Sequence, residues 1–401
     1  MNNPNSILIF GAGKIGRSFI GQIFGLAGYE VIFVEIDKSM VEALNRRGSY
    51  PVVIKGIKEE VIRVPNVRAL CFYRKEEVAR EVSTASLLAV SVGPNALGRV
   101  IPQISRGIRK RYQSNPDQPV DIIIAENMRD AASYMKERLI PQLPVNYPAG
   151  RLLGLVETSI GKMVPIMPEE ELEKDPLKVF AEPYNELILD GTAFKGSIPD
   201  VKELAPKSNM KAWVDRKAFI HNPGHATAAY MGAYQHPEAK YLYEVLRDGR
   251  VYNFTREVMQ QASLILLAEY PDDFSRQEPE DQTDDLLKRF GNRALGDTLF
   301  RAGRDIMRKL GPDDRFMGII RMAQPHGLAY GKILEAMIYG LLFRGKDESG
   351  KPYPGDVSMA GALSEDPGKT IDEVCGLHVP GDEKMIRECK YLYVQLNKSP
   401  G

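Results

Sequence analysis

The stretch SILIF at Ser6–Phe10, followed by GAGKIG at Gly11–Gly16, decides the fold of the first half of the chain. Its apolar, β-branched run predicts a buried strand, and the spacing of apolar residues over Lys14–Ala27 predicts a helix directly after it. A glycine-rich turn between a strand and a helix presents backbone N–H groups and the positive end of the helix dipole to an anion. We therefore expect this turn to bind the pyrophosphate of a dinucleotide.

The three glycines of the turn have separate tasks. Gly11 allows the tight turn, Gly13 lets the backbone approach the pyrophosphate, and Gly16 lets the helix pack closely on the strand. Lys14 and Ile15 complete the predicted cofactor-binding turn. The alternative interpretation is a glycine-rich turn without a ligand.

An acidic residue ends the next predicted strand. Glu35 lies about 20 residues beyond Gly16, where dinucleotide-binding folds carry the acid that holds the ribose hydroxyls. Its carboxylate would repel a 2′-phosphate, which favours NAD over NADP as the cofactor. Asp37 competes for this role, and the neighbouring basic residues leave some use of NADP open, namely Lys38, Arg46 and Arg47.

Further apolar runs, separated by helical stretches, follow at Ser86–Val92, Asp121–Ala125 and Leu152–Val156. Near-continuous apolar strands of this kind are typical of a mostly parallel sheet covered on both faces. Ligands of such sheets bind beyond the carboxyl ends of the strands. The predicted cofactor contacts therefore also include Ser91, Val92, Gly93 and Asn127. Gly93-Pro94 is equally compatible with a helix that begins at proline.

The second half of the chain differs in its pattern. Helical periodicity dominates from about Met210 to Phe343, and the polar stretches at Pro271–Asp285 and Gly345–Asp356 predict solvated loops. We expect an α/β fold of two domains. Residues 1–195 form a Rossmann-type, mostly parallel sheet domain that binds the dinucleotide, and residues 196–401 form a mainly α-helical domain for substrate and catalysis.

Composition limits the class of protein. Lys+Arg and Asp+Glu both number 53 among 401 residues, so the chain lacks the basic surplus typical of nucleic-acid binding. Its 3 cysteines are too few and too scattered for a disulfide framework or a zinc site, and no metal is expected. We see no signal peptide and no apolar run of about 18 residues. We expect a cytoplasmic enzyme or small-molecule-binding protein with no nucleic-acid or membrane partner.

The densest polar stretch of the second half is KAFIHNPGH at Lys217–His225, which holds two of the 5 histidines of the chain. Asn222 and His225 are spaced to share one helix face. Asn222 precedes a proline, which is typical of an N-cap, so one helix is predicted to end near His221 and another to begin after Asn222. The alternative interpretation is that Asn222 only caps, His225 only satisfies a backbone group, and Lys217 is a solvated charge.

The spacing Lys217-x4-Asn222-x2-His225 matches the K-x4-N-x2-H signature of the polyol-specific long-chain dehydrogenase/reductase family, which the chain resembles over nearly its whole length. The surrounding VDRKAFIHNPGHATAAYMG is similar to the corresponding stretch of bacterial members that act on mannitol 1-phosphate. Other elements in register are IFGAGKIGRSFIG, Ser91-Val92-Gly93-Pro94, Ala125-Glu126-Asn127, Phe194-Lys195-Gly196, Arg289-Phe290-Gly291-Asn292, Gly303-Arg304, Arg308-Lys309-Leu310, Asp314-Arg315 and Pro325-His326.

The resemblance implies metal-independent, NAD-dependent oxidation of a polyol phosphate, from mannitol 1-phosphate to fructose 6-phosphate. It implies Lys217 as the general acid/base. An ordinary lysine has a pKa of about 10.4, so burial and nearby positive charge must lower it for work near neutrality. By the same resemblance, Asn127 and Asn222 donate to the developing alkoxide, and His225 holds the carbonyl oxygen or a neighbouring hydroxyl.

A sugar phosphate is best held by the forked donors of arginine. The predicted substrate-binding residues are Lys195, Arg289, Arg293, Arg304, Arg315 and His326. The chain departs from the family pattern at Gly161-Lys162 and Asn292-Arg293. These departures leave open an unphosphorylated hexitol, pentitol or hexuronate, as used by mannitol 2-dehydrogenases or tagaturonate reductases. A non-catalytic NAD-binding protein also stays open, as does the choice between a monomer and a small homo-oligomer.

Overall fold

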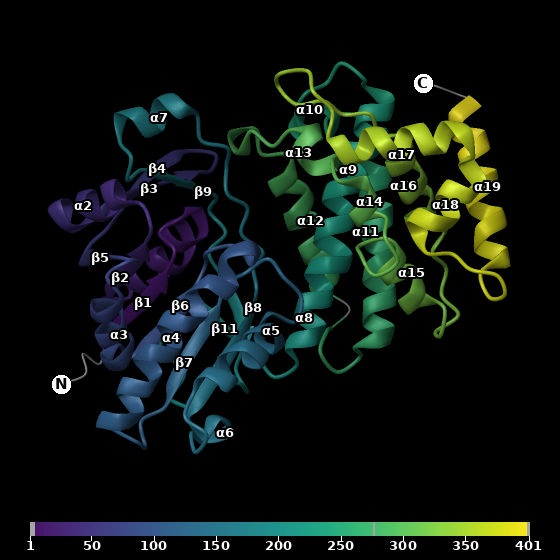
Figure 1. The fold of residues 1–401 in the computed structure, drawn as a ribbon. Coiled ribbons are helices and arrows are strands. Elements are labelled where there is room, and N and C mark those ends of the chain that lie inside the picture. The colour runs from purple at the N-terminus through teal and green to yellow at the C-terminus, as the bar shows by residue number, and fades with distance from the viewer. Residues whose placement is uncertain (1–4, 276, 399–401) are drawn as a thin grey trace. The chain divides into compact units, whose positions relative to one another are not determined.

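The computed structural model describes residues 5–275 and 277–398, and the chain divides into two compact units, Met1–Val214 and Asp215–Gly401 (Figure 1). The predicted domain boundary after residue 195 falls before this division. The segment between them belongs to the first unit because its strand Leu204–Lys207 (β11) pairs with a strand of that unit. Among the described residues, no helix is both long and apolar enough to cross a membrane.

The first unit is built on one large sheet with the strand order β11-β10-β8-β7-β6-β1-β2-β5. Neighbouring strands run parallel, except that β10 is antiparallel to β8. The predicted mostly parallel sheet is therefore confirmed. Its other strands are β1 (Ser6–Phe10), β2 (Glu30–Glu35), β5 (Val67–Cys71), β6 (Leu87–Val90), β7 (Val120–Ile124), β8 (Leu153–Ser159) and β10 (Leu187–Asp190).

Both faces of this sheet are covered, so its central strands are apolar on both sides. In β1, Leu8 and Phe10 face a core shared with the helices α3 (Lys75–Thr84), α4 (Pro94–Ser114) and α5 (Ala131–Leu139). Ile7 and Ile9 face the opposite core. That core is formed with the π-helical segment η1 (Gly16–Gly21), α1 (Gln22–Leu26), α2 (Lys38–Arg47) and a small second sheet.

The second sheet has the strand order β4-β3-β9. Its strands β3 (Tyr50–Lys55) and β4 (Glu59–Val64) form an antiparallel hairpin, and β9 (Val179–Ala181) pairs in parallel with β3. The remaining short helices of this unit are η2 (Ile140–Gln142), α6 (Ala149–Leu152) and α7 (Glu169–Lys174).

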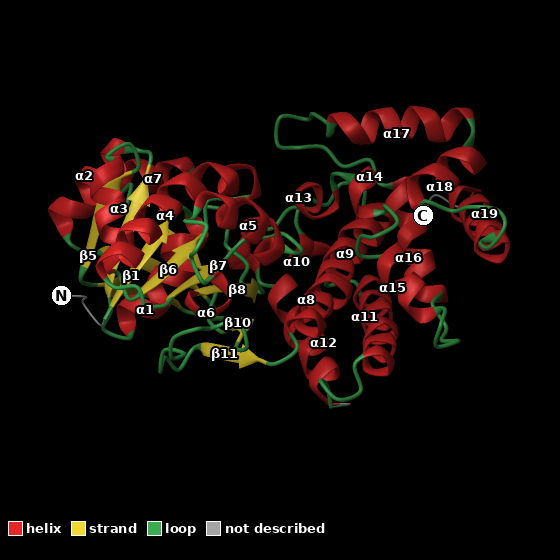
Figure 2. Cartoon of the chain, turned by 60° about the horizontal axis from the view of Figure 1, so that its bottom comes forward, coloured by secondary structure: helices red, strands yellow, loops and turns green. Residues whose placement is uncertain are grey.

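The second unit is helical, as predicted, and every named strand of the described residues belongs to the first unit (Figure 2). Its elements are η3 (Lys217–His221), α9 (Asn222–Gln235), α10 (Leu242–Val245), α11 (Gly249–Glu269), α12 (Gln277–Phe290), η4 (Arg293–Leu295), α13 (Leu299–Gly303), α14 (Ile306–Lys309), α15 (Met317–Ala323), α16 (Gly331–Leu342), α17 (Pro354–Glu365), α18 (Pro367–Cys375) and α19 (Glu383–Lys398). The helix α8 (Met210–Arg216) leads into this unit from the first.

One predicted loop is wrong over much of its length. The polar stretch Pro271–Asp285 contains the start of α12, which begins at Gln277. Thr283, Leu286 and Phe290 are buried on this helix at i, i+3 and i+7. A narrow buried face at helical spacing, on which Leu286 and Phe290 are apolar, therefore outweighs the charged residues around it.

Helix α9 is the centre of the second unit and is buried on nearly all sides. Small residues make this possible: a Cβ placed on Gly232 would lie 2.6 Å from a methyl group of Val245. The stiff, branched Val245 side chain on α10 cannot move aside cheaply. The close approach of α9 and α10 therefore depends on a glycine at this position.

We expect Gly232→Val to destabilise the second unit by about 3 kcal/mol, because overpacking a filled core forces side chains off their rotamers. Gly249→Val is the matched control, since a Cβ at Gly249 meets nothing within 4 Å. Chemical denaturation followed by circular dichroism measures both. Equal stability of the two variants would contradict this account of the α9 packing.

Candidate functional site

The glycine turn has the geometry that a ligand-binding turn requires. Gly11 has a φ of +99°, and a Cβ on it would lie 2.7 Å from the carbonyl oxygen of Ser91. A Cβ on Gly16 would lie 2.1 Å from the carbonyl oxygen of Gly11. A Cβ on Gly13 would meet nothing within 4 Å, and Lys14 beside it is exposed. The outer glycines are thus required by packing, whereas the middle one leaves open space for a ligand.

Two charged side chains hold the peptide groups of Ala12 within this turn. Glu35 Oε2 accepts a hydrogen bond from the Ala12 N–H at 2.9 Å. Arg17 is buried, and its Nε donates to the Ala12 carbonyl at 2.7 Å. Sequence reasoning did not select Arg17, although it follows Gly16 directly. Glu35 therefore lies against the glycine turn, and its role toward ribose stays a prediction.

Asp37 has a different local task from Glu35. Its Oδ1 accepts hydrogen bonds from the Ser39 N–H at 2.8 Å and the Met40 N–H at 3.3 Å, which caps the N-terminus of α2. The Ser39 hydroxyl also donates to Asp37 Oδ1, and this bond has the largest effect on the pKa of Asp37. Together with the two backbone bonds, it lowers that pKa. The sequence left Glu35 and Asp37 as competitors, and the structure places only Glu35 on the glycine turn.

The turn after β6 lies directly beside the glycine turn. The Ser91 N–H donates to the Phe10 carbonyl at 2.8 Å, and the Ser91 hydroxyl donates to the Gly11 carbonyl at 3.2 Å. Gly93 has a φ of +90° and precedes α4, which begins at Pro94 as expected. The sheet thus brings the predicted cofactor residues after β1, β2, β6 and β7 to one edge, with Asn127 two residues beyond Ala125.

Lys195 lies elsewhere in this unit. The N–H groups of Lys195 and Gly196 donate to the Asp121 carboxylate at 2.8 and 2.9 Å. Asp121 stands near the start of β7, at the amino edge of the parallel strands. The structure therefore does not bring Lys195 to the carboxyl edge that carries the glycine turn.

In the second unit, Lys217, Asn222 and His225 all stand on one continuous helical path. The predicted helix break before Pro223 is wrong: Asn222 has the helical values φ −67° and ψ −43°, and Lys217–His221 forms a π-helix between α8 and α9. A proline inside a helix lacks an N–H and crowds the preceding turn. The wider π-helical turn accommodates it, and such segments are frequent at functional sites.

Lys217 is half-buried on the π-helical segment. Burial, together with the nearby positive charge of Arg315, lowers the pKa of Lys217 to about 8. Arg315 is itself buried and is tied to this helix, because its Nη1 donates to the Asn222 carbonyl at 3.3 Å and its Nε donates to Asp314 Oδ1 at 2.8 Å. The structure thus supplies both causes of a lowered lysine pKa.

His225 is held by a buried carboxylate that sequence reasoning missed. His225 Nε2 lies 2.6 Å from Asp297 Oδ2, and Arg301 Nη1 donates to Asp297 Oδ1 at 2.8 Å. Burial alone would raise the pKa of Asp297, but the charges and hydrogen bonds of His225 and Arg301 outweigh it and lower the pKa to about 2. Asp297 is therefore a carboxylate that orients the His225 ring.

A second imidazole stands beside this pair. His221 is buried, and its ring centroid lies 6.4 Å from that of His225 and 5.4 Å from that of Phe290. Burial, followed by the positive charge of Arg289 and the neighbouring His225, Lys217 and Arg315, holds the pKa of His221 well below its usual range. His221 is therefore a neutral ring within a group of cationic side chains.

The predicted substrate residues separate into two groups. Arg289 and Arg315 act on the His221 ring and so belong to the cluster around Lys217. The other three residues of this unit have partners outside that cluster: Arg293 lies over the Tyr243 ring, Arg304 over the Phe300 ring, and His326 Nε2 lies 2.8 Å from Glu269 Oε2.

Lys309 is a buried cation that sequence reasoning left without a role. Its Nζ donates to the Ala302 carbonyl at 2.5 Å. Burial, with Arg315 and Arg308 nearby, lowers the pKa of Lys309 to about 7. Its place within the matched element Arg308-Lys309-Leu310 was a signal that could have selected it.

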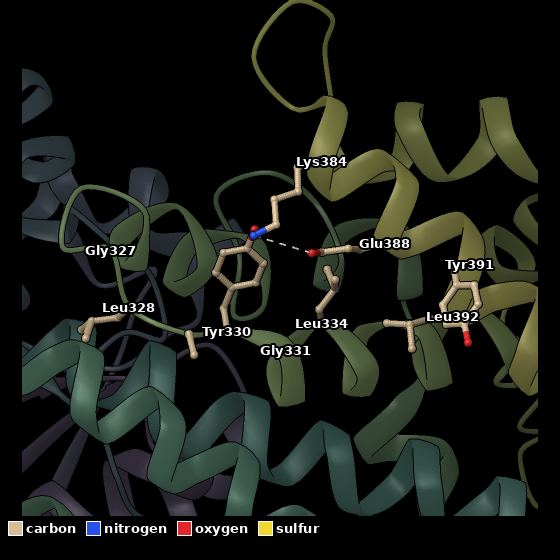
Figure 3. A pocket seen from close by; sticks show the side chains of 10 residues that line it. Gly327, Leu328, Tyr330, Gly331, Leu334, Lys384, Glu388, Tyr391 and Leu392 are labelled. Atoms are coloured by element: carbon tan, nitrogen blue, oxygen red, sulfur yellow. Dashed lines mark ion pairs between the residues drawn. The ribbon is translucent and has the colours of Figure 1, made fainter.

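A separate cavity of about 530 Å³ lies between residues 327–334 and helix α19. Figure 3 shows Tyr330 and Leu334 facing it, beside an ion pair in which Lys384 Nζ lies 3.8 Å from Glu388 Oε1. It is lined by none of the predicted site residues.

Comparisons with known proteins cover nearly the whole chain. The family model described as the mannitol dehydrogenase Rossmann domain matches residues 5–203, and that of the mannitol dehydrogenase C-terminal domain matches residues 209–374. Mannitol-1-phosphate 5-dehydrogenase of Enterococcus faecalis is 31% identical over 380 residues, which span 94% of this chain and 96% of that protein.

Two solved structures share the fold. D-sorbitol dehydrogenase in substrate-free form has a TM-score of 0.74 at 14% identity and covers 96% of this chain and 94% of its own. The ternary complex of Pseudomonas fluorescens mannitol 2-dehydrogenase with NAD and D-mannitol has a TM-score of 0.74 at 13% identity and covers 98% of this chain and 92% of its own.

We expect Asp297→Asn to destabilise the chain at pH 7 by about 2 kcal/mol, the free energy linked to a carboxyl pKa lowered by nearly two units. A lowered carboxyl pKa stabilises the fold above the ordinary value, and this is lost as the pH falls toward about 2. The difference from wild type should therefore shrink below pH 4. Denaturant midpoints from pH 7 to pH 3 measure it, with Asp285→Asn as an exposed control, and a pH-independent difference would rule out the linkage.

Proposed function

The chain belongs to the mannitol dehydrogenase family, and we propose that it oxidises mannitol 1-phosphate to fructose 6-phosphate with NAD as the hydride acceptor. The observation that carries this proposal is the half-buried Lys217, whose pKa burial and Arg315 lower to about 8 on the helix that also bears Asn222 and His225. The mannitol-1-phosphate 5-dehydrogenase of Enterococcus faecalis, similar over 94% of this chain, supports the choice of substrate.

NAD is held by the carboxyl edge of the large sheet. The open space at Gly13 admits its pyrophosphate, Glu35 receives the ribose hydroxyls, and the turn Ser91–Gly93 closes the edge beside them. Glu35 also disfavours NADP, because a 2′-phosphate would meet its carboxylate. When bound, NAD supplies the nicotinamide ring that accepts the hydride.

Lys217 takes the hydroxyl proton in the direction of oxidation. A base must be neutral to do so, and a pKa of about 8 leaves a useful neutral fraction near physiological pH. In the direction of reduction, the ammonium form returns the proton to the new alcohol. Asn222 donates an amide N–H bond to the oxygen, where negative charge develops, and the family resemblance implies the same role for Asn127. Each such donor is worth on the order of 10²-fold in rate.

His225 positions the substrate through its second ring nitrogen. Because the Asp297 carboxylate is ionised above pH about 2, Nε2 carries the hydrogen that is donated to it. In neutral His225, Nδ1 is then an acceptor. It therefore receives a hydrogen bond from a substrate hydroxyl in the oxidation, and it donates to a carbonyl only when the ring is protonated.

The phosphate of the substrate meets the cationic group formed by Arg289 and Arg315 beside His221. Arginine forks suit a phosphate dianion, and their charge compensates the cost of removing it from water. The further candidates for substrate contacts are Lys195, Arg293, Arg304 and His326. A hexuronate is the second candidate substrate, because its carboxylate suits the same cationic group.

The experiment that tests the function is a panel of ketoses assayed with NADH and with NADPH. We expect turnover with fructose 6-phosphate and NADH, weak turnover with fructose, and a preference for NADH because of Glu35. Turnover with tagaturonate alone would transfer the assignment to a hexuronate reductase. NADH binding without turnover of any ketose would show a non-catalytic binding protein.

We expect Lys217→Ala to lower kcat at least about 100-fold while leaving the NADH dissociation constant unchanged, because a general acid/base contributes about 10² to 10⁴ in rate. In the wild type, kcat for oxidation should rise with pH and level off above about 8, where the amine is neutral. Lys384→Ala, whose side chain is 78% exposed, is the control. A loss below about tenfold would assign the base to another group.

A further inference from the structure

A buried carboxylate joins two turns at the carboxyl edge of the large sheet. Glu126 is 5% exposed and lies two residues beyond Ile124, the last residue of β7. Its Oε1 accepts hydrogen bonds from the N–H groups of Val92 at 2.8 Å and Gly93 at 3.0 Å. Both donors belong to the turn after the neighbouring strand β6. The carboxylate thus replaces the strand-to-strand hydrogen bonds at the point where the two strands separate.

The backbone explains why a side chain is needed there. The parallel pairing of β6 with β7 reaches Val90 and Ile124, and the last bond across it runs from the Ala125 N–H to the Val90 carbonyl at 2.8 Å. Beyond it, Gly93 adopts a φ of +90° and turns the chain into α4. Without the Glu126 carboxylate, the Val92 and Gly93 N–H groups would lack their hydrogen bonds to the segment that follows β7.

The buried carboxyl group of Glu126 costs folding free energy when it is ionised. Within the described part of the chain, the carboxyl of Glu126 has no cationic partner, and burial raises its pKa to about 7 against the opposing effect of the two N–H groups. No ionised side chain of β1, β6, β7 or α4 contributes to that shift. Burying an unpaired carboxylate is costly. A neutral amide could accept the same two hydrogen bonds at lower cost.

The two bonds also decide where an anion can bind. Backbone N–H groups that precede a helix attract phosphate groups, and those of Val92 and Gly93 stand beside the glycine turn, to which Ser91 is hydrogen-bonded. Glu126 occupies them and adds a negative charge. A pyrophosphate would therefore be directed to the N–H groups of the glycine turn, while the turn at Ser91–Gly93 is fixed relative to Asn127, the residue after Glu126.

We propose that Glu126 is a positioning residue, whose carboxylate locks the Val92–Gly93 turn to the segment that carries Asn127 and so prepares this edge for the dinucleotide. The proposal rests on the proposed function, in which Asn127 and this turn serve NAD and the substrate oxygen. In this role Glu126 acts through the backbone of the Val92–Gly93 turn that it holds.

The test is Glu126→Gln in the full chain, with NADH affinity measured by fluorescence titration and apo stability by thermal unfolding. The amide keeps the shape and one acceptor oxygen but loses the charge. We expect the NADH dissociation constant to rise about tenfold, because hydrogen bonds to an ionised acceptor are about twice as strong as neutral ones. We expect the unfolding midpoint at pH 8 to stay level or rise. A raised carboxyl pKa penalises the folded state once the carboxyl ionises, and the amide removes that penalty.

The pH profile gives a second readout. Wild-type NADH affinity should weaken as the pH falls from 8 to 6, because protonation neutralises the acceptor, and Glu126→Gln should lose this step. The matched control is Glu157→Gln on β8. Its carboxyl also has a pKa raised by burial, and its Oε1 accepts from the Ala131 N–H at 3.1 Å, away from the turn after β6.

Three results would overturn the proposal. The first is an unchanged NADH affinity in Glu126→Gln. The second is weaker binding accompanied by a lower unfolding midpoint, which would show a purely structural role. The third is an equal loss in Glu157→Gln. None of these readouts depends on the ketose. Failure of the proposed function would instead appear as a wild type that does not bind NADH or does not reduce fructose 6-phosphate.

Discussion

The burial of a lysine amine beside an arginine is the constraint on which the proposed chemistry of the helical unit depends. Removing an ammonium group from water disfavours its charged form, and a second cation nearby acts in the same direction. Lys217 and Arg315 meet both conditions, and the π-helical turn at Lys217–His221 places the amine on the helix that also carries Asn222. The helices packed around α9 hold this arrangement, so the unfavourable burial of charge is offset by the apolar core of the unit.

The charged side chains at the two predicted sites have opposite signs in the two units. In the first, carboxylates organise the backbone: Glu35 accepts from Ala12, and Glu126 accepts from Val92 and Gly93. In the second, the positive charges of Arg289 and Arg315 lie near a neutral His221. A formal net charge of +0 over the whole chain therefore conceals an acidic group at the cofactor edge and a basic group at the predicted substrate site.

Local sequence patterns predicted the sheet and the glycine turn, because strand and helix periodicities and short motifs are contained in a few neighbouring residues. The roles of Lys217, Asn222 and His225, which the family resemblance implies, stay predictions. The same logic failed at Asn222-Pro223, where a local capping signal competes with a continuous helix that the π-helical turn makes possible. The contact of Asp297 with His225 could not be predicted from the sequence for another reason. It lies 72 residues from His225 in the chain, and no motif marks a buried carboxylate that meets its partner only after folding. Lys195 matched a family element, but its main chain is bound to Asp121 at the amino edge of the sheet.

The most direct test of this account is the titration of Lys217 itself. Reductive methylation with ¹³C-formaldehyde, followed by NMR across pH 6 to 11, reports the pKa of each lysine, and the signal missing from Lys217→Ala assigns the resonance. The account predicts that this resonance titrates near 8, distinct from that of Lys309 near 7 and from the ordinary lysine pKa of about 10.4. A Lys217 resonance that titrates near the ordinary lysine value of about 10.4 would contradict it, because such an amine would stay protonated at neutral pH and could not take the hydroxyl proton.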